Sequence, residues 1–539
     1  MITEVLYDPE PVIGLPAKEY IELFNASHDT VDLYNWTIRV GTKKTSLPRF
    51  LLSPESFVVL VPESGAEVFS YLNINVLSPD KWSVLRNSGQ FIALLSPDEN
   101  IIHFVQYHPS LFDDILKKEG GWSLELNDYR YPCAQKSWMP SFDYSGGTPG
   151  RKNSGFCKID ETHPPRPLRL GILDYNKLIL VLDNPVLPLR DDGWFQFDIE
   201  PFNSVSSWSY YNDYPWILEI VLKEFLTEGK IFTLSVSGEA TDCAGNDLED
   251  QILEFGLPED PLAGEVVISE ILFDPHENQS EFVCIHNRSG KILALNDLYI
   301  STCDDTGDVV SFSKPDEESF LMFPGMEYVL TSDAFLVKSM SDQDSHGRIC
   351  ERNDFPSLPN RGSGICLMDK KQQILDRVCY DPDWHNNELG ESKGFSLERI
   401  SLVNDGSISS NWHTASLISG GSTPGMPNSQ CSTSHDDSDL FGIENQIFCP
   451  DQDGYGSFLL INISTGEPGW TGSACVWDLS GNLVKELSQP SMLPVKGQIK
   501  WDGYDEFGKK VPLAYYAVII NFIRPDGSKG RWKEACVVQ

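Results

Sequence analysis

The feature that most constrains this chain is a phrase that occurs twice. Residues 145–154 read SGGTPGRKNS, and residues 419–429 read SGGSTPGMPNS. Glycine reaches positive φ and proline fixes its own φ, so either copy alone is ordinary turn chemistry. The residues upstream of both copies also match, however, and a chance recurrence of turn residues does not predict that.

Five further motifs recur in the same order, and the offset between copies drifts as insertions in loops would make it drift. The sequence therefore predicts a duplicated domain, in residues 1–155 and 262–430. The matched segments are residues 3–9 with 269–275, 19–25 with 281–287, 85–89 with 358–362, 105–107 with 378–380 and 121–126 with 394–399.

Each copy has the pattern of β-structure. EYIELFN, residues 19–25, alternates side chains with a period of two, and the runs FVVLV and FIALL end at Pro or Ser. Helical periodicity is scarce, and residues 111–119 are the best helix candidate in the first copy. Each copy is therefore expected to be an antiparallel β-sandwich.

The ordered motifs resemble a known family, the lamin tail domain in its bacterial form. They are E-[VI]-L-[YF]-D-P, E-[YF]-[IV]-x-[LI]-x-N, a DLYNW or LNDLY strand, N-x-G before a strand, and the closing Gly-Gly-Thr-Pro-Gly. The resemblance implies an Ig-like sandwich that serves as a binding module, mostly in exported multidomain proteins. The second copy departs from it where Glu22 becomes Cys284 and Trp36 becomes Leu298.

Two further segments resemble other Ig-like domains. Residues 158–258 contain the Asp-x-x-Gly-Asn turn of bacterial surface-layer Ig-like domains, which suits a spacer. Residues 440–539 resemble the flagellar hook-cap Ig-like fold, through F-x-P-D-x-D-G and W-D-G-x-D-x-x-G. The predicted fold is all-β, a string of four Ig-like antiparallel β-sandwich domains. The order resembles exported proteins of the Bacteroidota.

Charge and composition limit the partners. The formal net charge of −38 repels phosphate backbones, so nucleic acid is not an expected partner. No apolar run approaches the length of a membrane span, and the start of the chain is not a signal peptide, so we expect a removed leader. The twelve cysteines show no zinc spacing, and they suit either one or two disulfides or buried free thiols.

A search for catalytic chemistry finds no recognised motif: no G-x-S-x-G elbow, H-E-x-x-H, Walker loop or helix-opening G-x-G-x-x-G. His286 and His413 stand where the first copy has Phe24 and Met139, which favours packing or surface roles. The sequence predicts no catalytic residues and no enzyme.

The repeated acids and the tryptophans are predicted to be structural. Asp8 and Asp274 precede a proline, where an aspartate accepts backbone N–H bonds from the following turn. Glu4 and Glu270 belong to the same motif. The tryptophans at strand ends are expected to be core plugs rather than sugar platforms; they are Trp36, Trp122, Trp138, Trp412 and Trp501.

Calcium is the only cofactor that the sequence suggests. Asp451 and Asp453 have a two-residue spacing that can converge carboxylates on a hard cation, and Gly454 permits a tight turn. Two other acidic turns, in residues 304–308 and 502–506, have a similar composition. Plain turns stabilised by aspartate side chains explain all three equally well.

The sequence thus predicts a non-enzymatic scaffold or accessory subunit at the cell surface or outer membrane, acting through protein–protein contacts. The expected partners are other envelope proteins of an outer-membrane complex. Without a direct membrane span, attachment is expected through a lipid anchor on the removed leader or through another protein. The alternatives are an adhesin, a carbohydrate-binding surface protein, and an exported hydrolase with an unrecognised site.

Overall fold

The chain is almost entirely β-structure. Strands make up 42% and helices 8%, which confirms the predicted all-β fold. The computed structural model divides into two compact units, residues 1–168, 180–223 and 233–253 in the first and residues 169–179, 224–232 and 254–539 in the second. The structure describes residues 1–112, 115–129, 137–155, 163–186, 195–201, 203–303, 309–313, 320–352, 354–386, 392–431, 440–450 and 457–539.

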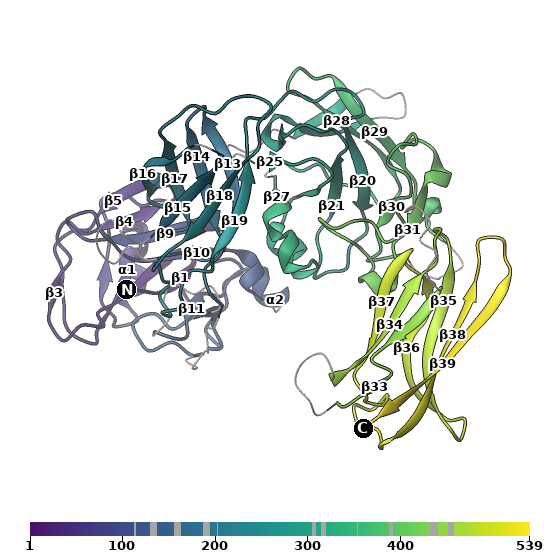
Figure 1. Cartoon of the computed structure of the whole chain (residues 1–539). Coiled ribbons are helices and arrows are strands. Elements are labelled where there is room, and N and C mark those ends of the chain that lie inside the picture. Colours follow the sequence, from purple (N-terminus) through teal and green to yellow (C-terminus); the bar gives the residue numbers. More distant parts are fainter. Residues whose placement is uncertain are drawn as a thin grey trace. The chain divides into compact units, whose positions relative to one another are not determined.

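The first repeat packs a six-stranded sheet against a four-stranded sheet (Figure 1). The six-stranded sheet runs β12 (Trp138–Pro140), β11 (Leu124–Leu126), β1 (Ile2–Leu6), β2 (Tyr20–Phe24), β7 (Phe57–Leu60), β8 (Val76–Leu77). The four-stranded sheet runs β10 (Ile101–Tyr107), β9 (Gln90–Leu95), β4 (Thr37–Val40), β5 (Lys43–Ser46), and β3 (Val31–Asp32) pairs with β6 (Leu51–Leu52).

Alternation along the strands explains how both faces of the larger sheet are used. Ile21 and Leu23 of β2 point into the core between the two sheets, while Tyr20 points to the opposite face. There Tyr20 packs with Phe69 of helix α1 (Glu63–Ser70), which the sequence did not predict. The helix predicted at residues 111–119 is shorter than expected, as η1 (Pro109–Leu111) and α2 (Ile115–Lys118).

The second repeat has the same strand order, which confirms the duplication at the level of topology. Its six-stranded sheet runs β27 (Ile349–Glu351), β26 (Glu327–Thr331), β21 (Phe282–Asn287), β20 (Val266–Leu272), β30 (Leu397–Arg399), β31 (Trp412–Thr414). Its four-stranded sheet runs β24 (Val309–Ser313), β23 (Tyr299–Cys303), β28 (Ser363–Met368), β29 (Ile374–Tyr380), and β22 (Leu293–Ala294) pairs with β25 (Leu321–Met322).

Short helical segments complete the second repeat. In both repeats the last pair of the larger sheet is parallel, β7 with β8 and β26 with β27, with a helix between the two strands. The helical segments are α3 (Ala334–Ser339), η4 (Leu295–Asp297), η5 (Gln343–Arg348), η6 (Pro382–Trp384), η8 (Ser409–Asn411) and η9 (Leu417–Ser419).

The segment between the repeats forms two small sheets. One runs β13 (Pro167–Asp174), β14 (Lys177–Leu182), β17 (Ile217–Leu222), β16 (Val205–Tyr210), and the other runs β15 (Gln196–Glu200), β18 (Phe232–Ser237), β19 (Gln251–Phe255); η3 is Tyr211–Asp213. The carboxylate of Asp242 accepts N–H bonds from Ala244 and Asn246, which closes the Asp-x-x-Gly-Asn turn.

The last hundred residues form a sandwich of three and five strands. The first sheet runs β32 (Phe441–Glu444), β34 (Leu459–Ser464), β37 (Lys496–Trp501). The second runs β33 (Ile447–Phe448), β39 (Lys529–Val538), β38 (Ala514–Ile523), β35 (Thr471–Asp478), β36 (Leu483–Met492). The β38–β39 hairpin is the long yellow pair in Figure 1. The domain boundaries drawn from the sequence stay predictions.

Candidate functional site

Three acidic residues lie side by side in the first repeat. In the strand register, Glu4 of β1 is the direct partner of Glu22 on β2 and of Glu125 on β11. All three residues are fully buried, with 0% of their surface exposed. Because directly paired residues of antiparallel strands lie about 5 Å apart, the three carboxyl groups form one acid cluster.

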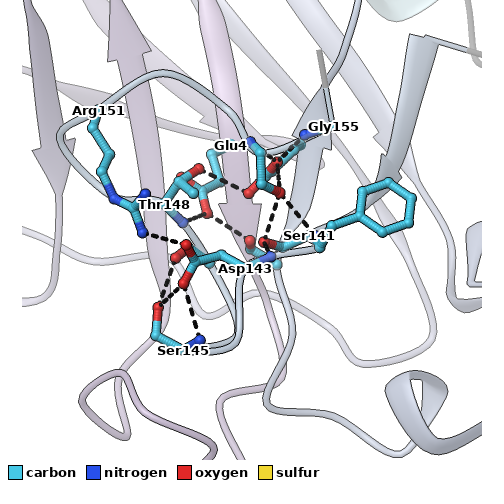
Figure 2. A network of polar contacts seen from close by, with 12 residues as sticks. Glu4, Ser141, Asp143, Ser145, Thr148, Arg151 and Gly155 are labelled. Atoms are coloured by element: carbon cyan, nitrogen blue, oxygen red, sulfur yellow. Dashed lines mark hydrogen bonds and ion pairs between the residues drawn. The ribbon is translucent and has the colours of Figure 1, made fainter. Parts of the chain in front are cut away.

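The Gly-Gly-Thr-Pro-Gly phrase covers this acid cluster, as Figure 2 shows for Glu4 and Thr148. The N–H of Thr148 donates to Glu4 Oε1 at 2.7 Å, and its hydroxyl donates to Glu125 Oε1 at 2.8 Å. The N–H of Ser154 donates to Glu125 Oε2 at 2.6 Å. The phrase therefore recurs because its backbone provides hydrogen-bond donors to buried acids.

The closing loop approaches the sheet so closely that it needs its glycines. The N–H of Gly150 donates to Glu22 Oε2 at 2.6 Å, with a φ of +80° that glycine adopts readily. A Cβ on Gly147 would lie 2.5 Å from Tyr20 Oη and 2.7 Å from Glu4 Oε1. The loop backbone thus rests directly on the carboxyl groups.

Hydroxyl groups on the strands complete the coordination of the acids. Tyr20 Oη donates to Glu4 Oε1 at 2.6 Å, and Ser123 Oγ donates to the same atom at 2.5 Å. Burial, followed by the nearby Glu125, raises the pKa of Glu4 to about 7, and burial raises the pKa of Glu22 well above its ordinary value. Carboxyl groups this close, with donors but no cation beside them, share protons at neutral pH.

The second repeat builds the same anchor from two acids. Glu270 is paired with Glu398 in the register, and both are fully buried. The N–H of Thr423 donates to Glu270 Oε1 at 2.7 Å, and its hydroxyl donates to Glu398 Oε1 at 2.8 Å. Burial, followed by Glu398, raises the pKa of Glu270 to about 8. Cys284 replaces the third acid and donates its S–H to Glu270.

A third acid of the second repeat has moved to the neighbouring strand. Glu327 of β26 accepts a bond from Ser269 Oγ at 2.6 Å, just as Glu22 accepts one from Thr3 in the first repeat. Glu327 also pairs with His286 Nδ1 at 2.8 Å. The sequence assigned His286 a packing or surface role and missed this pair, although the change from Phe24 to His286 marks the position.

The closing loop of the first repeat carries two exposed aromatic rings. Tyr144 is 90% exposed and Phe142 is 60% exposed. Between them, Asp143 accepts bonds from the N–H and hydroxyl of Ser145 and pairs with Arg151 at 2.6 Å, as Figure 2 shows. Burial opposes the change, but the bonds from Ser145 and Arg151 lower the pKa of Asp143 to about 2. The loop is pinned on both sides.

The matching loop of the second repeat contacts the C-terminal sandwich within the second unit. Ser416 Oγ donates to the carbonyl of Met492 at 2.7 Å, and Gln430 Nε2 donates to the carbonyl of Leu493 at 3.0 Å. Ile418 packs against the core of that sandwich. Ser416 and Phe142 are equivalent, because the N–H of each donates to the serine that ends its own phrase.

The structure does not test the predicted calcium site, because Asp451 and Asp453 lie outside the described residues, as do residues 304–308. In the third acidic turn, Asp502 accepts the N–H of Tyr504, and Asp505 accepts those of residues 507 and 509. Within the described part of the chain there is no group of three or more His, Cys, Asp or Glu suited to a metal ion. No helix there is both long and apolar enough to cross a membrane.

The Asp-Pro motif works differently from the prediction. Asp8 Oδ2 accepts a bond from the side-chain amide of Asn87 at 2.7 Å, and Asp274 Oδ1 accepts one from Asn360 at 2.8 Å. The expected acceptance from the following turn is therefore replaced by a bond to the N-x-G motif. Two motifs that lie about 80 residues apart in each repeat are thus one contact.

The tryptophans divide into two groups. Trp138, Trp412 and Trp501 are 4%, 2% and 1% exposed, as expected of core plugs. Trp36 and Trp122 are only partly buried at the edge of the core, because an open side of the sandwich lies beside them.

The cysteines are mostly free thiols. Nine of the described cysteines are unpaired, including every cysteine of the two sequence clusters. Cys243 is in a disulfide. Cys303 and Cys366 carry their sulfurs 2.9 Å apart on neighbouring strands β23 and β28.

Comparison with solved structures finds remote likenesses. A DUF4876 family protein from Bacteroides thetaiotaomicron is 13% identical, with 46% of this chain and 91% of that chain covered and a TM-score of 0.17. Latent PorU from Porphyromonas gingivalis is 10% identical over 75% of this chain, with a TM-score of 0.14. The Yersinia pseudotuberculosis adhesin InvE is 9% identical over 42% of this chain and 64% of that chain, with a TM-score of 0.14.

These likenesses carry no argument about function at such TM-scores, and the alignment spans only 35% of the PorU chain. No curated protein matches the chain. The family comparison is more direct, because it covers the strands that build the first acid cluster and its sandwich, apart from β11 and β12. Residues 1–109 match the Lamin Tail Domain, a non-catalytic Ig-like fold.

Proposed function

We propose that this protein is a non-enzymatic scaffold or accessory subunit at the surface of a Bacteroidota-type bacterium. It acts by protein–protein contact, and its partners are other envelope proteins of an outer-membrane complex. A lipid anchor or one of those partners holds it at the membrane. The contact surface is the closing loop of the first repeat, residues 142–146.

The observation that carries this proposal is the use of the equivalent loop in the second repeat. There Ser416, Ile418 and Gln430 contact a neighbouring β-sandwich of the same chain. The first repeat presents the same loop with Tyr144 and Phe142 exposed. A loop that receives a β-domain in one repeat is suited to receive one in the other.

The chemistry of the exposed loop supports the same use. Aromatic rings contribute large contact areas and are enriched among the residues that dominate binding energy. Asp143 and the acid cluster fix the backbone beneath the rings, so little conformational entropy is lost on binding. The net charge of −38 favours a partner with basic patches over DNA or anionic lipid.

Cross-linking of the full chain in its native envelope, followed by affinity purification and mass spectrometry, tests the proposal. We expect a defined set of envelope proteins, with cross-links near residues 142–146. The double variant F142A/Y144A should reduce the capture of these proteins at least tenfold.

The matched control is Y71A/F507A, which removes two rings that are 79% and 94% exposed on other surfaces. It should leave capture unchanged. A chain that always purifies alone, or equal losses in both double variants, would contradict the proposal. Retention on glycans with no protein partner would support the carbohydrate-binding alternative instead.

A further inference from the structure

The second repeat contains a cavity beside its displaced acid. The cavity holds about 220 Å³, below the roughly 300–1,000 Å³ of drug-sized ligand sites. Polar groups on its wall come from His286, Glu327 and Arg348, and apolar groups come from Met326 and Leu402. The polar side chains thus converge on one small space, from strands β21 and β26 and the turn η5.

The first repeat fills the same place with aromatic rings. Phe24 stacks on Phe57 with ring centroids 4.6 Å apart, and Tyr129 packs on Phe24 at 5.5 Å. The strand register aligns the pair Phe24 and Phe57 with the pair His286 and Glu327. Tyr129, three positions beyond β11, aligns with Leu402, three beyond β30. A plug of three rings in one repeat is therefore a polar, hollow space in the other.

The charges around the cavity are unequally matched. Glu327 is satisfied, because it accepts bonds from His286 and from Ser269. The guanidinium of Arg348 donates from Nε and Nη2 to the carbonyl of Gly425, at 3.2 and 2.9 Å. Among the described residues no carboxylate pairs with it. A half-buried guanidinium without an acid partner is unusual in a chain with 79 acidic and 41 basic residues.

We propose that this cavity binds a small monocarboxylate with a short apolar body. The carboxylate pairs with Arg348, whose planar fork matches carboxylate geometry. The apolar body lies against Met326 and Leu402. His286, which is oriented by Glu327, contributes its remaining ring nitrogen to the polar end of the cavity.

Other ligand classes fit the cavity less well. A phosphate would bring a second negative charge close to Glu327, which costs more than a single carboxylate does. A metal ion lacks three His, Cys, Asp or Glu ligands in the described part of the chain. Catalysis by the thiol of Cys431, which also lines the cavity, is disfavoured because burial and the nearby acids raise the pKa of that thiol.

Isothermal titration of the full chain with acetate, butyrate, hexanoate and decanoate at constant ionic strength tests the proposal. We expect one saturable site, with affinity that rises from acetate and then falls once the chain outgrows the cavity. The matching methyl esters lack the charge and should bind at least tenfold more weakly.

Two variants locate the site. R348M should weaken binding at least tenfold, whereas R348K should weaken it less because it keeps the charge. The triple variant H286F/E327F/L402Y installs the plug of the first repeat and should abolish binding. Circular dichroism and the melting temperature check that each variant is folded.

The reverse variant F24H/F57E/Y129L, made in the first repeat, is the matched control and should leave the site in the second repeat unchanged. No saturation with any acid up to 10 mM would overturn the proposal. Equal binding of acids and esters would overturn the role of Arg348, and so would unchanged affinity in folded R348M. Binding that persists in the folded plug variant would show that the ligand lies elsewhere.

Discussion

The two repeats share a loop anchor but differ in what they do with the third acid. In the first repeat Glu4, Glu22 and Glu125 lie together under one loop. In the second repeat Glu270 and Glu398 suffice, and the third acid sits one strand away beside a histidine. The comparison teaches that two carboxyls are enough to hold the phrase, while the third position is free to acquire another role.

Removal of the central acid should give the largest effect and should separate the repeats. E4A leaves the N–H of Thr148 and the hydroxyls of Tyr20 and Ser123 without their acceptor, and each buried unpaired donor costs about 1–3 kcal/mol. We expect a loss of roughly 3–5 kcal/mol in the free energy of unfolding of the first repeat.

E270A removes fewer strong donors, those of Thr423 and Ser396, and should cost less. Denaturant unfolding at pH 6, with hydrogen exchange at the two closing loops, measures both losses. Equal losses, or an intact loop in E4A, would show that the acids do not anchor the phrase.

The pH dependence should be the next largest effect. Below about pH 4.5 the acids are protonated in both folded and unfolded chains, so their contribution to stability is fully present. As the pH rises toward 7, the unfolded chain loses the proton while Glu4 in the folded chain keeps it, and stability falls. A difference between about 4.5 and about 7 corresponds to roughly 3 kcal/mol.

The fall should continue to about pH 8 in the second repeat, because Glu270 titrates later. E4Q and E270Q cannot ionise and should each flatten the slope for their own repeat. Melting temperatures between pH 4 and 9 measure this. Identical slopes in wild type and both variants would contradict the prediction, since the many surface acids are the same in all three.

A third prediction sharpens the comparison at one contact. The first repeat pairs Tyr20 with Gly147, and the second has Phe282 and Ser422 in the matching places. G147S should cost about 1–3 kcal/mol, because its Cβ meets the Tyr20 hydroxyl. The double variant Y20F/G147S recreates the pair of the second repeat and should recover part of that loss. A double variant with the sum of both single losses would show that the two positions are independent.

The smallest predicted effect concerns the partly buried rings. Trp122 and Phe395 occupy matching places, and both are only partly buried. Since part of each ring is already in water, W122A and F395A should cost about 1–2 kcal/mol rather than the roughly 3–5 of a core aromatic. Unfolding of the single variants, compared with that of W412A, measures this. A loss as large as that of W412A would place these rings in the core.

The fold was more predictable than the sites. Repeated motifs and strand alternation predict the duplication and the all-β class, because both are local patterns. The acid cluster was not predictable in this way, since Glu4 and Thr148 lie 144 residues apart and meet only through strand register. The Asp8 contact was predicted with the wrong partner for the same reason.

The cavity shows a second limit of the sequence. The change from Phe24 to His286 was visible, but its meaning depends on Glu327 and Leu402, which are distant in sequence and change at the same place in space. A search for matched changes between the repeats, weighted by strand pairing, would have found it. Composition alone carried no such signal.

The anchor also decides how the first repeat responds to mechanical tension. Asn153, near the end of the repeat, donates its amide to the carbonyl of Thr3 in the first strand, beside the bond between Thr148 and Glu4. A pull on both ends of this repeat therefore acts across a short clamp of buried hydrogen bonds, and the strands of the sandwich behind it carry little of the force. A surface protein exposed to flow gains an early, local yield point and keeps the rest of its fold.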